Sequence, residues 1–560
     1  MRGTVYRLLV GLTLVAGLGV CASARSDCIE AEGELQRAMQ EAVVALEARS
    51  AGEADRLAVQ VQRFYAASDF EPVWFDASCR PVRAQEVIDI LVEASAHGMD
   101  PDAYAATALA AVLEERKHGR PVHASEVAEY DLRLTVALFR YLSHLHNGKV
   151  DPRQVIPNFA DAAKELAPAE AVRRAVSESS LDVIVDSAAP RYPAYERLRR
   201  ALDRYRNLER EAFVEPLPVV RRLRAGDAYQ ALPQLQRRLV ALGDMAEEAQ
   251  VPDRYTGEIV EAVRRFQARH GLTVDGVIGP ATFEQLNVPL SQRIRQIELA
   301  LERLRWLPRL EADRLIVINI PEFRLRALDV GQEDARVLVD MRAIVGRAFD
   351  TETPVFLGRV QRIELSPYWN VPASIATNEL VPRLRRDPAY LQREGMEFVG
   401  LGVGARVSRD VTAANLAALA RGELRIRQRP GPRNVLGGIK FPLSSSLDIY
   451  LHGTDVPALF SRTRRDLSHG CVRLERPEVL AAVLLEDQPD WTIERIRSAM
   501  HAQVRSTVNL TKPVPVLIFY TTTVVEPGGS ILFLPDIYGH DRALARALRA
   551  ASSGASPASR

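Results

Sequence analysis

The sequence lacks an excess of charge of either sign. Its 560 residues hold 73 lysines and arginines against 72 aspartates and glutamates, which gives a formal net charge of +1. This balance argues against a body that binds nucleic acid, because such a body would carry a basic patch or stripe. Hydrophobic residues make up 47% and charged residues 26%, which excludes a mostly disordered chain and a fibrous repeat. At about 100–200 residues per domain, the chain should fold as several modules.

Long apolar runs are also missing after residue 24, since no later segment approaches the roughly 18 uninterrupted apolar residues of a membrane-spanning helix. The first 24 residues are different. Two arginines precede an apolar run from Leu8 to Val20, and Ala22-Ser23-Ala24 closes it, which matches a secretory signal with its cleavage site. We therefore predict a signal peptide over 1–24 and export of the remaining chain. An uncleaved signal that anchors the protein in the inner membrane is the alternative.

Cysteine is scarce, with four in the whole chain. Removal of the signal leaves Cys28, Cys79 and Cys471, an odd number in a compartment where disulfides persist. Cys28 and Cys79 both lie in the N-terminal region, so we predict a disulfide between them and a free thiol at Cys471. A free thiol in an oxidising compartment is prone to oxidation unless it is buried or has a chemical role. The residues around Cys471 are therefore the most informative about function.

The N-terminal part of the chain shows helical periodicity. Residues 25–215 are interpreted as an α-helical domain without visible chemistry, with apolar positions recurring every three to four residues. Three further apolar stripes over 227–289 predict a small three-helix bundle, whose first helix ends at Gly243 and whose third has Pro280 in its first turn. The phrase from Phe266 to Pro280, with Asp275-Gly276-Val277-Ile278-Gly279 inside it, resembles the peptidoglycan-binding domain of bacterial wall enzymes. We place that domain at 220–290; the alternative is that the motif only shapes a turn.

A β-rich region follows the bundle. From about Leu315, β-branched alternation predicts short strands of the kind found in a sandwich. Residues 373–436 interrupt this pattern with helical and loop-like sequence, and strand signals return at 449–452. We predict a β-sandwich-like domain over 310–500 with a capping subdomain inserted at about 373–436. The fold class is thus multidomain α+β.

The C-terminal region is predicted to end in an extension and a tail. Val514–Tyr520 and Ile531–Tyr538 are interpreted as the two strands of a β-hairpin within residues 501–550. Residues 551–560 are predicted to be a disordered tail.

Two short motifs carry the chemistry: Tyr450-Leu451-His452-Gly453-Thr454 and Ser468-His469-Gly470-Cys471-Val472-Arg473-Leu474. A nucleophilic cysteine needs a base, backbone donors for the developing oxyanion and open access. If 468–474 is extended, His469, Cys471 and Arg473 share one face, and the two histidines and the arginine could hold Cys471 as a thiolate. Because Gly470 has no side chain, the amides of Gly470 and Cys471 could point at a substrate carbonyl.

The two histidines are expected to differ in role. His469 is two residues from Cys471, so in a strand their side chains would run side by side. His452 is expected on another strand, where directly opposed residues have Cβ atoms about 4.5–5.5 Å apart, close enough for a ring nitrogen to meet the sulfur. Geometry therefore favours His452 as the base, with Gly453 leaving room or a carbonyl to orient its ring.

The pairing of His452 with Cys471, 19 positions later and within Ser-His-Gly-Cys, resembles the catalytic signature of the L,D-transpeptidase family. The phrases 366–372 and 427–434 resemble its large periplasmic members, which combine a helical scaffold, a peptidoglycan-binding domain and a capped catalytic domain. The resemblance implies Cys471 as nucleophile and His452 as general base. Among the neighbouring residues, we expect an oxyanion or supporting role for Gly470, His469, Gly453 and Ser468, and substrate contacts for Arg473, Tyr450, Trp369 and Tyr368. The alternatives are that Tyr368 and Trp369 belong to the core and that Arg473 pairs with Glu475 or Glu478 on the surface.

The resemblance also implies a reaction and its partners. Cys471 would attack the stem peptide at its third residue, expel the terminal D-alanine and pass the acyl group to the side-chain amine of a neighbouring stem, giving a 3→3 cross-link. Carbapenems would acylate the same cysteine, and no cofactor or metal would be required. The expected partners are the stem peptides and glycan strands of peptidoglycan and other wall synthases, without nucleic acid, in the periplasm.

Two other classes of protein stay open at this point. A zinc-dependent murein peptidase could use His452, His469 and Cys471 as ligands, although the sequence has no His-Glu-x-x-His motif and no obvious separate carboxylate base. A non-catalytic wall-anchoring protein could rely on the bundle at 220–290 alone.

Overall fold

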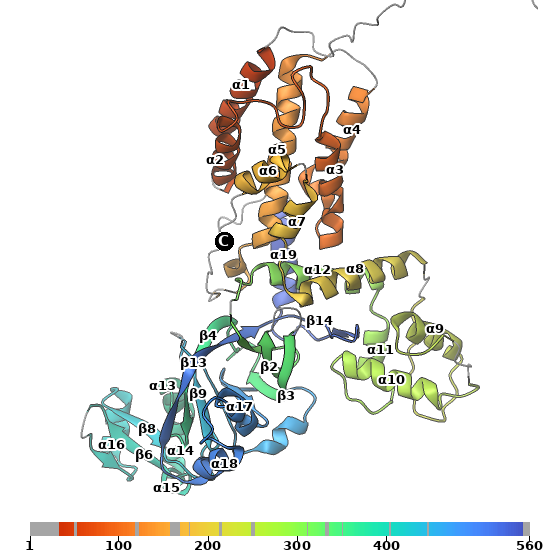
Figure 1. Cartoon of the computed structure of the whole chain (residues 1–560). Helices are drawn as coiled ribbons and strands as arrows, with labels where there is room; N and C mark the ends of the chain where they lie inside the picture. The colour runs from red at the N-terminus through yellow and green to blue at the C-terminus, as the bar shows by residue number, and fades with distance from the viewer. Residues whose placement is uncertain are drawn as a thin grey trace, which may run out of the picture. The chain divides into compact units, whose positions relative to one another are not determined.

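A computed structural model describes most of the chain (Figure 1). The described residues are 33–49, 53–117, 122–156, 159, 168–178, 180–211, 215–247, 252–310, 312–330, 335–349, 351–402, 405–444 and 447–552. The predicted signal peptide, Cys28 and nearly all of the predicted tail lie outside them. No helix within these ranges has the length and the apolar character that a membrane span requires.

The chain divides into two compact units, which are described separately. The first comprises Met1–Val92, Tyr104–Tyr141 and Ala167–Ile184, and the second comprises Glu93–Ala103, Leu142–Leu166 and Val185–Arg560. The helical region predicted at 25–215 therefore contributes to both units.

Helices build the first unit. They are α1 (Glu34–Arg49), α2 (Glu53–Ala66), α3 (Ala84–Val92), α4 (Ala106–Lys117), α5 (Ala124–Asn147), α6 (Pro168–Ser177) and α7 (Asp182–Ala188), of which α5 and α7 continue into the second unit. Inside, the Tyr65 hydroxyl donates to Asp131 Oδ1 at 2.6 Å and the Trp74 amide donates to Asp131 Oδ2 at 2.8 Å. Burial raises the pKa of Asp131 to about 6. Cys79 is disulfide-bonded, but its partner is not among the described residues, so the pairing with Cys28 stays a prediction.

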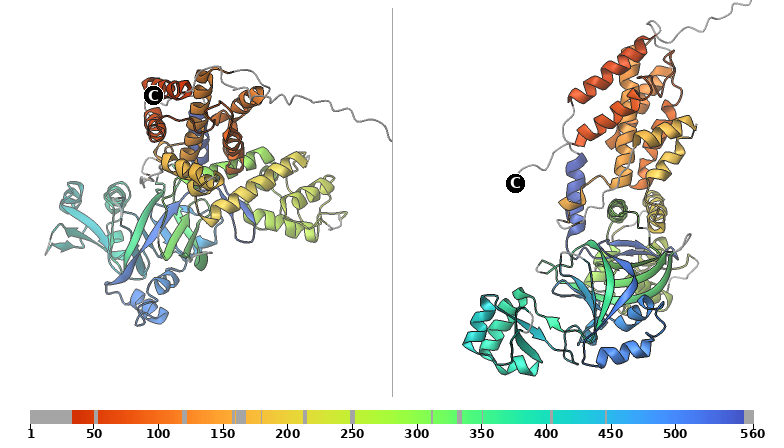
Figure 2. Two further views of the ribbon diagram at one scale, coloured as in Figure 1. Left: turned by 45° about the horizontal axis from the view of Figure 1, so that its top comes forward. Right: turned by 60° about the vertical axis from the view of Figure 1, so that its left-hand side comes forward.

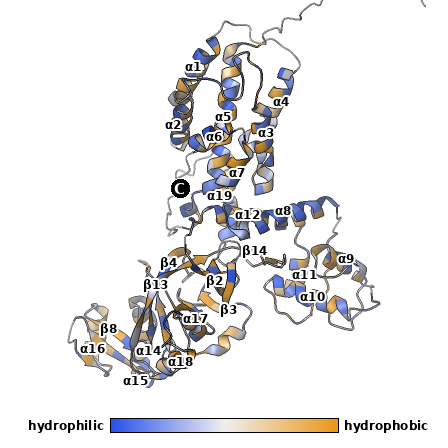
Figure 3. Ribbon diagram, in the orientation of Figure 1, coloured by the Kyte–Doolittle hydropathy of each residue, from blue (hydrophilic) through white to orange (hydrophobic). Residues whose placement is uncertain are grey.

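Two long helices and a small bundle begin the second unit. Helix α8 (Pro193–Glu211), largely hydrophilic in Figure 3, is joined to α12 (Leu290–Arg305) by the Arg206–Glu298 ion pair at 3.0 Å. The predicted three-helix bundle is α9 (Leu232–Leu242), α10 (Glu258–Arg269) and α11 (Pro280–Leu286), and it has a hydrophobic core of its own. Helix α9 ends at Gly243, whose φ of 83° is left-handed.

The motif that links α10 to α11 shapes a turn. Gln267 Nε2 donates to Asp275 Oδ1 at 3.1 Å, and Gln267 Oε1 accepts from the Gly276 amide at 2.9 Å. The Asp275 carboxylate also accepts from the Val277 amide at 2.9 Å. These residues therefore have a structural task, whether or not the bundle also binds the wall.

A nine-stranded sheet forms the body of the predicted β domain. Its strands are β1 (Arg314–Asn319), β2 (Arg324–Val330), β3 (Ala335–Gly346), β4 (Phe356–Leu365), β9 (Ile439–Pro442), β10 (Tyr450–His452), β11 (Asp466–Ser468), β12 (Val472–Leu474) and β13 (Ser506–Phe519). Their order is β11-β3-β12-β10-β9-β4-β13-β1-β2, and β2 also pairs with β3. The sheet thus closes on itself, and its strands curve around a common core (Figure 2). Helices α17 (Pro477–Leu484) and α18 (Ile493–His501) contribute Leu480, Leu484 and Ile496 to that core.

The capping subdomain lies between β4 and β9. Strands β5 (Trp369–Asn370), β6 (Met396–Gly400), β7 (Val407–Ser408) and β8 (Leu424–Gln428) form a four-stranded sheet in the order β5-β8-β6-β7. Helices α13 (Ala373–Ile375), α14 (Val381–Arg386), α15 (Ala389–Arg393) and α16 (Ala413–Ala420) accompany it. A separate core includes Phe398 and Ile426. Since Trp369 already pairs with Gln428, the subdomain begins a few residues before the predicted position 373.

The C-terminal extension differs from the predicted hairpin. Val514–Tyr520 is not half of it, because β13 pairs parallel with β1 and antiparallel with β4 inside the large sheet. The hairpin is instead β14 (Thr523–Val525) with β15 (Ile531–Phe533), and helix α19 (His540–Ser552) follows. An alternating apolar pattern predicts a strand, but it does not reveal which strand is its partner.

Candidate active site

Four neighbouring strands bring a row of polar side chains to one face of the large sheet. Glu364 on β4 is paired with Lys440 on β9, Lys440 with His452 on β10, and His452 with Arg473 on β12. Residues directly opposite each other on adjacent strands point to the same face. The sequence interpretation missed Glu364 and Lys440. Lys440 alternates with the buried Ile439 and Phe441, a local signal that could have placed it on the polar face.

Cys471 directly precedes β12, whose Val472 pairs with Leu451 of β10, and so lies at the level of Tyr450. The backbone and the hydroxyl of Tyr450 both lie close enough to the thiol to lower its pKa, and the sulfur lies 4.0 Å from the Asp448 carbonyl oxygen. Lys440 Nζ is 4.1 Å from the centre of the Tyr450 ring. The nucleophile predicted from sequence is therefore next to a phenol hydroxyl and an ammonium group.

The protonation state of the Cys471 thiol differs from the one expected from the sequence. Burial raises the pKa of its thiol, and the hydrogen bonds from Tyr450 and the charge of Lys440 lower that pKa only in part. The prediction of a standing thiolate held by two histidines and an arginine is thus wrong. At neutral pH the thiol keeps its proton, which must leave during the reaction.

His452 lies on the face that carries Cys471, but not directly opposite it. Its register partner is Arg473, so His452 and Cys471 are diagonal neighbours and the expectation of direct opposition is wrong by one position. The ring is 4% exposed. Burial, followed by the charges of Arg473 and Lys440, lowers the pKa of His452 to about 3, while interactions with the backbone of Gly453 raise it. The ring is therefore neutral at pH 7 and can accept a proton, but a pKa this far below neutrality makes it a weak base, and the assignment of His452 as base stays a prediction.

His469 has its side chain away from the thiol. Its Nε2 lies 2.8 Å from Glu379 Oε1 in the capping subdomain and 2.9 Å from Arg347 Nη2 at the end of β3. The expectation that 468–474 is one extended strand is wrong, because β11 ends at Ser468, β12 begins at Val472 and the intervening Gly470 has a φ of 111°. That left-handed backbone favours glycine at this position.

The hydroxyl group of Ser468 stabilises the loop before Cys471. Ser468 Oγ donates to the Cys471 carbonyl at 2.6 Å and accepts from the Gly470 amide at 3.2 Å. The Gly470 amide is therefore used inside the loop, which corrects the expectation that two amides face the substrate. The Cys471 amide is left as the backbone candidate for the oxyanion.

The predicted substrate-contact residues have partners of their own. Arg473 interacts with Asp455, and burial lowers the pKa of its guanidinium. Burial raises the pKa of Tyr450 and the Trp369 side chain lowers it in part, so Trp369 brings the cap close to the Tyr450 hydroxyl. The Tyr368 ring is stacked under Arg427, whose Cζ is 4.4 Å from the ring centre.

The glycine after His452 has a steric role. A Cβ at Gly453 would lie 3.1 Å from the Leu436 carbonyl oxygen, so the strand end closely approaches the chain that leaves the cap. The room predicted at Gly453 is thus filled by backbone.

The zinc-peptidase arrangement is not formed. His469 contacts Glu379 and Arg347, whereas Cys471 contacts Tyr450. Over the described ranges, no group of three or more histidine, cysteine, aspartate or glutamate side chains is placed to hold a metal ion.

Comparisons with protein families define the class of the chain. Residues 59–202 match the family described as "Scaffold domain", residues 229–286 match "Putative peptidoglycan binding domain", and residues 313–509 match "L,D-transpeptidase catalytic domain". The three matches stand in the order expected from the motifs, and the multidomain α+β class is confirmed.

One curated relative and two solved structures resemble parts of the chain. A Haemophilus influenzae protein named "Putative L,D-transpeptidase" is 31% identical over 249 residues, which are 44% of this chain and 48% of the relative. The chain thus matches about half the length of that relative. An L,D-transpeptidase of Xylanimonas cellulosilytica is 18% identical, with a TM-score of 0.16, over 55% of this chain and 100% of the other. A fused Zn-dependent amidase, peptidase and peptidoglycan-binding protein of Clostridium acetobutylicum is 13% identical, with a TM-score of 0.17, over 53% and 99%.

Proposed function

We propose that the protein is a peptidoglycan L,D-transpeptidase that forms 3→3 cross-links. The observation that carries the proposal is the Cys471 thiol on the polar face of the closed sheet, next to Tyr450 and on the face of His452, inside a domain of the L,D-transpeptidase family. The peptidoglycan-binding family of residues 229–286 supports the wall as substrate.

The first half of the reaction is acylation of the enzyme. Cys471 Sγ attacks the carbonyl carbon of the third residue in a donor tetrapeptide, and its proton passes to His452. Because both groups are neutral at rest, we expect proton transfer to accompany the attack. The amide bond to the terminal D-alanine breaks, its nitrogen takes the proton from His452, and a thioester remains.

The second half returns the free enzyme. The side-chain amine at the third position of a neighbouring stem attacks the thioester, gives a proton to His452 and forms the new amide. The sulfur leaves and takes the proton back from His452. The Cys471 amide would bind the oxyanion in both halves, and Arg473 would bind a substrate carboxylate.

The cellular setting belongs to the same proposal. The secretory pattern of residues 1–24 supports export, and the reaction requires a location at the wall, so we place the protein in the periplasm. The signal is cleaved in this proposal, and other wall synthases are partners because they supply the uncross-linked stems.

The decisive experiment incubates purified protein with disaccharide-tetrapeptide and follows the products by mass spectrometry. We expect tripeptide–tetrapeptide dimers and free D-alanine, and we expect a covalent adduct on Cys471 after treatment with a carbapenem. Cys471→Ala should abolish all three products. Dimers formed by the alanine variant would exclude Cys471 as the nucleophile, and absence of product and adduct in the wild type would favour a wall-anchoring protein.

Wall binding can be tested separately. The bundle has its own core, so a fragment of residues 220–290 should sediment with insoluble peptidoglycan. If it stays in the supernatant at every salt concentration, the bundle is only a spacer.

A further inference from the structure

The orientation of the Gly470–Cys471 peptide is fixed by Thr353, a residue that the sequence interpretation did not single out. Thr353 Oγ1 donates to the Gly470 carbonyl oxygen at 2.7 Å and accepts from the Gly346 amide at 2.8 Å. In a planar trans peptide the carbonyl and the following amide point in opposite directions. A fixed Gly470 carbonyl therefore fixes the direction of the Cys471 N–H, the backbone candidate for the oxyanion.

Thr353 is in turn held by a residue of the C-terminal segment. The Tyr538 hydroxyl donates to the Gly346 carbonyl at 2.6 Å and accepts from the Thr353 amide at 3.2 Å. It thus joins the two ends of the turn that connects β3 with β4. Burial raises the pKa of Tyr538, so the hydroxyl keeps the proton that it donates.

The backbone of the turn approaches Gly346 closely. A Cβ at Gly346 would collide with the Thr351 carbonyl oxygen, so the two ends of the turn touch through backbone atoms. Thr353 is 1% and Tyr538 6% exposed, and water therefore cannot readily replace the missing partner if either hydroxyl is removed.

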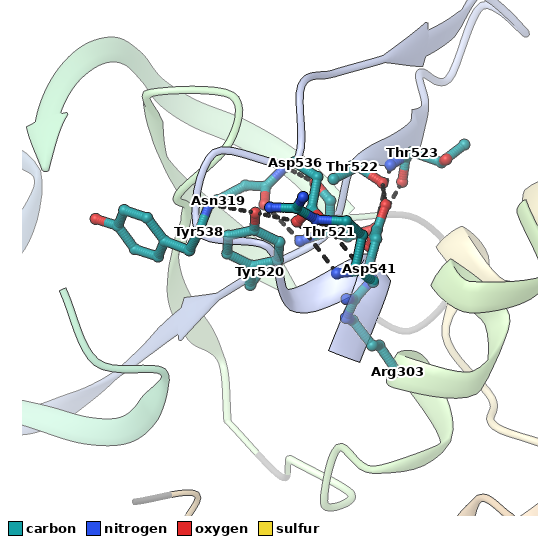
Figure 4. Close-up of polar contacts among 10 residues, drawn as sticks. Arg303, Asn319, Tyr520, Thr521, Thr522, Thr523, Asp536, Tyr538 and Asp541 are labelled. Atoms are coloured by element: carbon teal, nitrogen blue, oxygen red, sulfur yellow. Dashed lines mark hydrogen bonds and ion pairs between the residues drawn. The ribbon is translucent and has the colours of Figure 1, made fainter. Parts of the chain in front are cut away.

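Tyr538 itself is held by hydrogen bonds to other residues of the C-terminal segment. Its amide donates to the Tyr520 hydroxyl at 3.0 Å, and that hydroxyl donates to Asp536 Oδ1 at 2.6 Å. The same carboxylate oxygen accepts from the Asp541 amide at 3.1 Å. In turn, Arg303 Nη1 of α12 donates to Asp541 Oδ1 at 2.5 Å. Figure 4 shows these residues gathered together, and the Tyr538 ring is stacked against the Tyr520 ring with centroids 5.7 Å apart.

We propose that Tyr538 is a positioning residue for the acyl transfer proposed above: its hydroxyl holds Gly346 and Thr353 so that Thr353 aims the Cys471 amide at the developing oxyanion. The role rests on the proposed function and deepens it. Residue 538 lies beyond the 313–509 range that matches the catalytic family, so this support comes from outside the matched domain.

Two reactions of the Cys471 thiol distinguish a misplaced oxyanion donor from a general disturbance of the site. Acylation by a carbapenem passes through an oxyanion, whereas alkylation by iodoacetamide displaces iodide without one. In full-length Tyr538→Phe we expect acylation to slow at least about tenfold, since a misplaced oxyanion donor is costly, and alkylation to stay within about twofold of the wild type. A residue with a purely structural role would change both rates together or neither.

Matched variants complete the test. Thr353→Val should reproduce the selective loss of acylation, Thr353→Ser should restore most of it, and the double variant Tyr538→Phe/Thr353→Val should be no slower than the slower single variant. Tyr130→Phe is the control, because it removes a buried tyrosine hydroxyl that donates to the Leu109 carbonyl in the other compact unit. If Tyr538→Phe does not fold, the Thr353 pair decides.

The outcomes that overturn the proposal are distinct. Wild-type acylation rates in Tyr538→Phe, or equal losses of acylation and alkylation, would refute the positioning role and leave the proposed function intact. A wild-type enzyme that is alkylated but neither acylated nor able to cross-link would refute the proposed function and this role with it.

Discussion

Replacement of Asp541 by alanine should leave the buried guanidinium of Arg303 without its charge partner. Arg303 is 1% exposed, and its Nη1 donates to Asp541 Oδ1 at 2.5 Å. Its Nε and Nη2 have no hydrogen-bond partner among the described residues. Asp541 therefore supplies the charge compensation for Arg303, and Thr522 Oγ1 adds a hydrogen bond to the same carboxylate.

The size of the effect follows from the burial. Removal of one partner from a buried ion pair costs about 3–5 kcal/mol, because the other charge stays desolvated. At about 1.36 kcal/mol per factor of ten, local opening in Asp541→Ala should become roughly one hundred to several thousand times more frequent. Hydrogen exchange of peptides covering 299–305 and 514–520, read by mass spectrometry, measures this opening without assuming that a multidomain chain unfolds in one step.

Two further variants sharpen the test. The double variant Arg303→Met/Asp541→Ala should exchange more slowly than Asp541→Ala alone, because it removes the uncompensated charge. Glu261→Ala breaks the half-exposed Arg264–Glu261 pair and should cost less than about 1 kcal/mol. An Asp541→Ala protein with wild-type exchange, or a double variant in which the two losses simply add, would refute the reasoning.

Three other predictions concern the cysteines and histidines of the chain. Alkylation of Cys471 should reach half its maximal rate above the pH of about 8.5 typical of a free thiol, because burial raises the pKa of this thiol. Lys440→Met should move that midpoint higher still and Lys440→Arg should not, whereas a wild-type midpoint near neutrality would contradict the burial argument. His452→Ala should remove most carbapenem acylation and His469→Ala should leave more of it; the reverse result would exchange their roles. Under denaturing, non-reducing conditions the mature protein should show one alkylatable thiol, with Cys79 protected in its disulfide, and three would refute the predicted pairing.

The sequence alone determined the features that depend on neighbouring residues. The helical period of 232–242 and the glycine at 243 were sufficient for a helix and its end, because both depend on local backbone geometry. The spacing of the two catalytic motifs was likewise sufficient to nominate Cys471 and His452, since each motif is a continuous stretch of chain.

Tertiary structure decided everything that depends on strand register and on distant contacts. A shift of one position in the pairing of β10 with β12 decides that Tyr450, not His452, lies beside Cys471, and the alternation within each strand is the same in either register. The contact of His469 with Glu379 crosses 90 positions of sequence, and the bond from Tyr538 to Gly346 crosses 192. Such pairs leave no local pattern, because they form only when the closed sheet brings the cap, the β3–β4 turn and the C-terminal segment to the loop of Cys471. The neutral state of that thiol has the same origin, since burial is a property of the assembled fold.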